Sequence, residues 1–92
     1  MPTKTFKLTG FDEGGVQKSR DNRNLRLVCL IQGGGKLVVW GSERSHDNID
    51  KVLGAGMPGD IECEFISPEA WAIRYGHTYW VPQGRKLRVL SK

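Results

Sequence analysis

The chain has no long apolar run and few cysteines. No window approaches the ~18 apolar residues that a membrane-spanning helix requires, and residues 1–4 lack the apolar core of a signal peptide. Cys29 and Cys63 each fall within a strand pattern, so we interpret them as reduced core thiols rather than a disulfide. We therefore expect a cytoplasmic protein that does not contact a membrane.

Motifs for catalysis and cofactor binding are also missing. Ser45, His46 and Asp47 are contiguous, and contiguous side chains diverge instead of forming a catalytic triad. Residues 33–35 are glycines, but they lie between two predicted strands with no helix to complete a phosphate site. Two cysteines and two histidines at scattered spacing match no zinc site. We expect no enzymatic activity, no cofactor and no metal.

The composition is that of one folded domain over residues 1–92. Hydrophobic residues make up 38% and charged residues 26% of the chain, which argues against disorder. Twelve glycines in clusters are typical of a β protein rich in turns. A net charge of +4 favours acidic partners, nucleic acid among them.

Hydrophobic alternation predicts a mainly β protein with one short helix. Apolar residues at i, i+3 and i+4 (Ile49, Val52 and Leu53) predict the helix, with Ser45 or Asp47 as its cap and Gly54 at its end. Strands are predicted over 5–9, 25–31, 36–40, 60–65, 70–75, 78–81 and 85–90, with glycines 33–35 as a hairpin turn and 12–23 as a long loop.

This order of elements resembles the OB-fold, a small Greek-key barrel. The resemblance is carried by residues 25–31, 37–40, 49–53 and 61–65, and the segment 52–61 looks like the entry into the fourth strand of such domains. It implies a five- to six-stranded barrel with the helix between strands three and four. Strands 70–75 and 78–81 exceed the OB-fold pattern, so they form an inserted hairpin or indicate another small barrel.

The resemblance implies binding of single-stranded nucleic acid, in which aromatic rings stack on bases and cations follow the phosphates. The candidate stacking residues are Trp40, Trp71, Tyr75, Tyr79 and Trp80, of which Trp40 and Trp80 rank first. Glu62 and Glu64 oppose phosphate on their own strand. The candidate phosphate contacts are Arg26, Lys36, Arg74, Arg85, Lys86 and Arg88, with Lys18, Arg20 and Arg23 on the predicted loop.

A structural role for these residues is the alternative, because aromatics also fill small cores and cations also protect strand edges. A second alternative is a protein-interaction module or a homodimer that uses the region of Trp71, Tyr75, Tyr79 and Trp80. Salt distinguishes the ligands, because nucleic-acid binding weakens steeply as salt rises. The sequence does not distinguish DNA from RNA.

Overall fold

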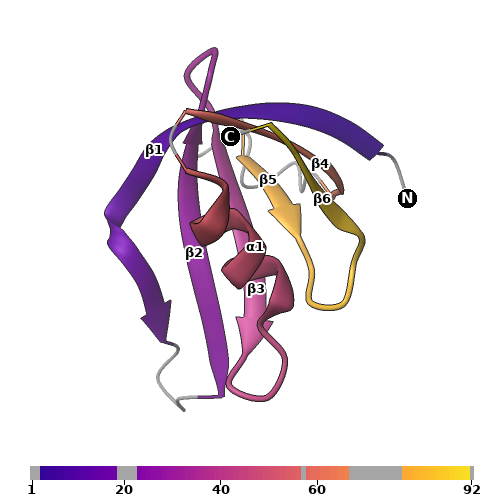
Figure 1. Cartoon of the computed structure of the whole chain (residues 1–92). Helices are drawn as coiled ribbons and strands as arrows, with labels where there is room; N and C mark the ends of the chain where they lie inside the picture. Colours follow the sequence, from indigo (N-terminus) through magenta and orange to yellow (C-terminus); the bar gives the residue numbers. More distant parts are fainter. Residues whose placement is uncertain (1–2, 19–22, 57, 67–77, 92) are drawn as a thin grey trace.

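The computed structural model describes residues 3–18, 23–56, 58–66 and 78–91 (Figure 1). Within these residues, six strands form one mixed sheet in the order β5-β3-β2-β1-β4-β6, in which only β3 and β5 are parallel neighbours. The elements are β1 (Thr3–Lys18), β2 (Asn24–Ile31), β3 (Lys36–Ser42), α1 (Asp47–Ala55), β4 (Gly59–Glu64), β5 (Thr78–Val81) and β6 (Leu87–Ser91).

The sheet is open, so the prediction of a closed, OB-like barrel is wrong. Closure requires a continuous ladder between the two edge strands, and here β5 and β6 occupy opposite edges. Across the described residues, the end of β4 reaches β5 through one isolated antiparallel bridge, in which the backbones of Ile66 and Trp80 exchange hydrogen bonds of 2.8 and 2.7 Å. The edge strands have four and five residues, and no ladder in the described residues joins them.

The first strand is much longer than predicted and replaces most of the expected loop. Its first half pairs with β4, from Thr3 opposite Glu64 to Leu8 opposite Gly59, and its second half continues along β2 to Lys18. Figure 1 shows β1 bent between these two partners. The register shifts between Phe11 and Val16, and such a bulge absorbs the polar, glycine-bearing residues that suggested a loop. Residues 19–22 of the predicted loop lie outside the described part.

Glycines make the β2–β3 hairpin, as predicted. Gly33 and Gly34 have φ of 101° and 92°, values that a residue without a Cβ adopts at no steric cost. The backbone N–H of Ile31 donates to the carbonyl of Gly35 across the turn. The predicted strands 60–65 and 78–81 are also confirmed as β4 and β5. The strand predicted at 85–90 is confirmed from Leu87 to Leu90, and β6 continues to Ser91. The strand predicted at 70–75 lies outside the described residues.

The core lies between the sheet and α1, which covers one face of it (Figure 1). Ile49 and Val52 of the helix are almost completely buried against the strands, and Cys29 and Cys63 lie in the same core as free thiols. The helix runs to Ala55 and is followed by Gly56 at φ 78°, so Gly54 does not end it. Leu53, predicted on the apolar face, is 44% exposed. In the described part of the chain, no helix has the length and apolar character to cross a membrane.

Candidate binding face

The face of the sheet opposite α1 carries a mixed set of aromatic, aliphatic and basic side chains, which we call the outer face. It is formed by alternate residues of β2, β3 and β5, because side chains alternate between the two faces of a strand. Strand register places these residues side by side: Arg26 opposite Trp40, Val28 opposite Val38, and Val38 opposite Trp80. The outer face comprises Arg26, Val28, Lys36, Val38, Trp40 and Trp80.

Trp40 and Trp80 form an aromatic pair on this face. Their ring centroids are 5.9 Å apart and the ring planes are inclined at 67°, an edge-to-face arrangement. Both side chains are half-buried, and Val28 and Val38 beside them are only 7% and 6% exposed. The two indoles thus lie beside the buried aliphatic side chains of Val28 and Val38, which we call the aliphatic floor. Each indole keeps part of its surface accessible to a ligand. The two leading stacking candidates are therefore adjacent in space.

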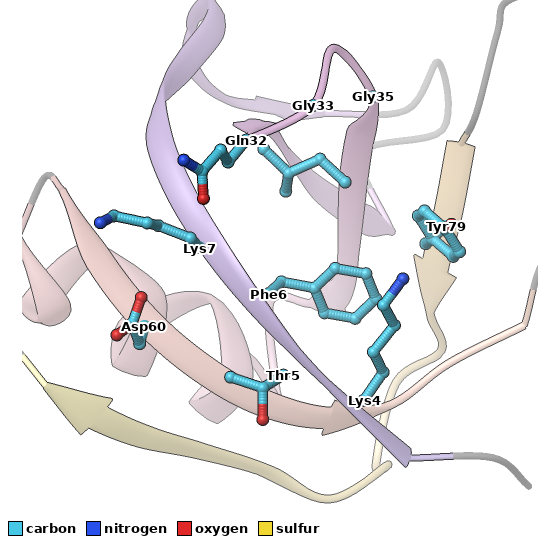
Figure 2. A pocket seen from close by; sticks show the side chains of 10 residues that line it. Lys4, Thr5, Phe6, Lys7, Gln32, Gly33, Gly35, Asp60 and Tyr79 are labelled. Atoms are coloured by element: carbon cyan, nitrogen blue, oxygen red, sulfur yellow. The ribbon is translucent and has the colours of Figure 1, made fainter.

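The structure places Tyr79 on the opposite side of the sheet from this pair. Its ring packs against Phe6 and Phe65, with centroid distances of 5.0 and 5.2 Å. The ammonium of Lys4 lies 5.1 Å from the Tyr79 centroid, and Figure 2 shows it beside both rings. Tyr79 therefore belongs to a separate aromatic cluster and does not extend the Trp40–Trp80 pair.

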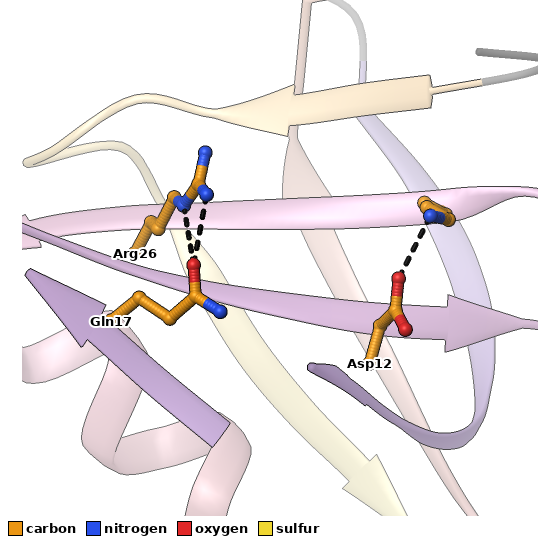
Figure 3. A network of polar contacts seen from close by, with 4 residues as sticks. Asp12, Gln17 and Arg26 are labelled. Carbon is orange, nitrogen blue, oxygen red and sulfur yellow. Dashed lines mark hydrogen bonds and ion pairs between the residues drawn. The ribbon is translucent and has the colours of Figure 1, made fainter. Parts of the chain in front are cut away.

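Arg26 is oriented by an amide on the neighbouring strand. Its Nε and Nη2 donate to Gln17 Oε1 at 3.2 and 2.8 Å (Figure 3). The two residues are register partners on β1 and β2, and Trp40 is the register partner of Arg26 on β3. The contact with Gln17 restrains the guanidinium beside Trp40, and an amide adds no opposing charge.

Lys36 pairs with a carboxylate rather than with an amide. Its ammonium lies 2.8 Å from Asp12 Oδ2, and both side chains are partly exposed. Asp12 lies at the bulged part of β1, so the bend of this strand brings a carboxylate to the hairpin end of the outer face. An anionic ligand at Lys36 would have to compete with this carboxylate.

The remaining basic candidates lie away from the aromatic pair. Arg88 forms an ion pair of 2.9 Å with Glu62 at the β4–β6 edge, and Lys18 lies 3.5 Å from Glu43. Arg85 and Lys86 are exposed in the turn before β6. Arg23 lines a surface pocket of about 480 Å³ together with Ser42, Glu43 and Arg44. Arg20, Arg74, Trp71 and Tyr75 lie outside the described residues.

Gln17 and Asp12 are the site residues that sequence reasoning missed. Both were assigned to a loop, and their positions depend on the bulge that lets β1 continue to Lys18. The only signal in the sequence is the short alternation of Val16, Gln17 and Lys18. That alternation is too short to predict a strand, and it does not show which strand would pair with it.

The thiols of Cys29 and Cys63 are unreactive in the folded state. Burial raises the pKa of Cys29 to about 12, with a further contribution from the charge of Cys63. Burial likewise raises the pKa of Cys63 to about 12, with a smaller contribution from Glu62. Both are therefore protonated at neutral pH, and a thiol reacts as a nucleophile or binds metal only as the thiolate.

Potential metal ligands and acid–base pairs are sparse in the described part of the chain. These residues include no group of three or more His, Cys, Asp or Glu side chains that could hold a metal ion. His46 Nδ1 lies 2.8 Å from Asp50 Oδ2 at the exposed start of α1. This pair lies on the helix side of the sheet, away from the outer face.

No family model, curated protein or solved structure matches the chain. The likeness to the OB-fold thus rests on element order alone, and the open sheet contradicts it.

Proposed function

We propose that the chain is a non-catalytic binding module whose outer face takes single-stranded nucleic acid with little sequence preference. The observation that carries this proposal is the position of Arg26, which is held by Gln17 on one side and lies beside Trp40 on the other. A base that stacks on an indole places its phosphate within reach of a neighbouring cation, and this combination suits any base because every base has a π-face.

The Trp40–Trp80 pair supplies the stacking surface. The two indole planes are inclined to each other and offer a nucleic-acid strand two stacking surfaces at different angles. Bases that contact both rings must therefore be splayed apart rather than stacked on each other. Single strands tolerate this because their bases are not held by pairing. A duplex is excluded from such contacts, since its bases are already stacked.

Basic residues continue along the sheet beyond Arg26. Arg23 immediately precedes β2 and Arg44 follows β3, at the end where Asn24 pairs with Ser42. Arg23 and Arg44 line the same pocket of about 480 Å³. The proposed strand path therefore runs from Trp80 across Trp40 and Arg26 toward Arg23 and Arg44, away from the Lys36–Asp12 pair.

The test is the affinity of the protein for a labelled oligothymidine, measured by fluorescence anisotropy at low and at physiological salt. Arg26→Gln should weaken binding about three- to tenfold at low salt and reduce the slope of log K against log salt by about one, because one phosphate contact is lost. Trp40→Phe should also weaken binding, because the smaller ring offers less stacking area.

Arg85→Gln is the matched control, because it removes the same charge from the turn before β6 and should leave affinity almost unchanged. Absence of binding at low salt would contradict the proposal. So would equal losses in Arg26→Gln and Arg85→Gln, because the protein would then be acting only through its net charge.

The aliphatic floor favours a protein ligand as the second candidate. Val28 and Val38 extend toward Leu30, which is 36% exposed, and an apolar centre with an arginine beside it is typical of protein interfaces. A protein partner or a second copy of the chain would bind with weak dependence on salt. Sedimentation velocity over a range of protein concentrations would detect self-association through this face.

A further inference from the structure

The structure assigns a second ligand site to the other side of the sheet, independent of the outer face. An open pocket of about 440 Å³ lies between the first residues of β1, the β2–β3 hairpin and β5. We propose that it binds a small aromatic molecule that carries an anionic group, such as a nucleoside monophosphate or an aromatic carboxylate. The volume falls in the range of small-molecule sites.

One wall of the pocket is aromatic. Phe6 and Tyr79 line it, and their rings are 5.0 Å apart within a cluster completed by Phe65. Phe6 is 3% exposed and is fixed in the core, whereas Tyr79 is half-buried. The wall is therefore rigid, and it keeps an accessible edge against which a planar ligand can pack at little cost in conformational entropy.

The ammonium of Lys4 lies beside this aromatic wall. Lys4 Nζ lies 5.4 Å from the Phe6 centroid and 5.1 Å from the Tyr79 centroid, over both rings. Figure 2 shows its side chain running along Phe6 with the ammonium toward Tyr79. An ammonium so placed attracts the ring of a ligand by a cation–π contact and its anionic group by charge. These two contacts together select an aromatic anion over a plain one.

Polar groups line the rest of the pocket. Lys7, Gln32 and Asp60 line the end of the pocket away from Lys4 (Figure 2). The lining therefore contains two cations, Lys4 and Lys7, and one carboxylate. The hairpin glycines form the remaining wall, and a Cβ placed on Gly33 would meet nothing within 4 Å. Gly33 and Gly35 add no side chain to this wall of the open pocket.

The experiment is a titration of the isotopically labelled protein followed by amide and indole NMR shifts. The ligands are adenosine monophosphate and benzoate, with adenosine and inorganic phosphate as controls for the ring and the charge. Saturable shifts should concentrate at residues 4–7, 31–35 and 79 and leave the Trp40 and Trp80 indole signals unchanged. Lys4→Gln should weaken adenosine monophosphate binding about three- to fivefold, as loss of one exposed charge contact predicts.

Lys86→Gln is the control, because it removes a lysine charge outside this pocket and should bind adenosine monophosphate like the unaltered protein. The proposal fails if no saturable shift occurs at millimolar ligand, or if Lys4→Gln and Lys86→Gln bind equally well. Phosphate or adenosine binding as tightly as adenosine monophosphate would overturn the requirement for an aromatic anion. Binding of adenosine monophosphate but not of benzoate would show that the site takes nucleotides rather than aromatic carboxylates. Shifts at the indoles instead would support the outer face and contradict this site.

Discussion

At the scale of single residues, strand alternation found the aromatic pair but not its polar neighbours. Trp40 and Trp80 were selected because each alternates with inward aliphatic residues, and the structure places their rings 5.9 Å apart. Such alternation is local and can be read from sequence. Gln17 and Asp12 reach the same face only through the register of β1 with β2, which no local pattern encodes. The residues that restrain the cations were therefore beyond sequence reasoning.

Asp12 should limit anion binding at the hairpin end of the outer face. Its carboxylate lies 2.8 Å from the Lys36 ammonium and repels any phosphate that approaches. We expect Asp12→Asn to strengthen oligothymidine binding about two- to fivefold at low salt, with the gain lost at high salt. The measurement is fluorescence anisotropy, as for Arg26→Gln. Asp50→Asn changes net charge equally on the exposed start of α1, so an equal gain there would contradict a local effect.

At the scale of elements, short amphipathic segments were predictable and their limits were not. The helix, the glycine hairpin, β4 and β5 follow from periodicity and turn residues within one segment. The helix end was misplaced because Gly54 and Gly56 both look like stop signals, and only the backbone shows that Gly56 has the positive φ. The predicted loop over 12–23 was wrong from Asp12 to Lys18 because a bulge keeps a polar, glycine-bearing segment in the sheet.

Two glycines next to or within α1 should respond oppositely to alanine. A Cβ on Gly41 would lie 3.1 Å from Ile49 Cδ1, 3.1 Å from the Ser45 carbonyl oxygen and 3.2 Å from His46 Cα. In Gly41→Ala the backbone at the start of α1 must therefore shift slightly away from β3. We expect a loss of about 1–3 kcal/mol in the free energy of unfolding. Gly54 lies inside the helix with nothing within 4 Å of an added Cβ, so Gly54→Ala should gain about 0.5–1 kcal/mol.

Urea denaturation measures both changes. The two substitutions add the same methyl group, so equal effects on stability would show that the close approach of β3 and α1 does not depend on Gly41.

At the scale of the whole molecule, closure of the sheet could not be read from the sequence. The number and order of strands resemble those of a barrel, but closure depends on which strands meet at the edges. Here β5 joins β3 and β6 joins β4, and a turn at residues 82–86 links strands that lie at opposite edges. Both pairings are long-range in sequence, and strands of four or five residues carry no signal of their partner.

The core thiols link the stability of the whole molecule to alkaline pH. Cys29 and Cys63 have pKa values raised from 9.0 to about 12 by burial, so between these values the folded state holds protons that the unfolded chain has released. The contribution of the two protonated thiols to the free energy of unfolding is therefore complete below about pH 9. It is lost as pH rises toward 12, by up to about 1.4 kcal/mol per pH unit for each thiol. Urea denaturation at pH 8, 9.5 and 10.5 measures this slope.

The slope must be compared with that of the Cys29→Ala, Cys63→Ala double variant, which removes both thiols. That variant loses some stability at every pH because it leaves space in the core, but its slope should be shallower than that of the unaltered protein. Parallel slopes would mean that the thiols are solvated in the folded state, which would contradict their complete burial on β2 and β4 on either side of β1. The pH dependence of stability therefore tests whether both thiols are protonated and whether they lie inside the core.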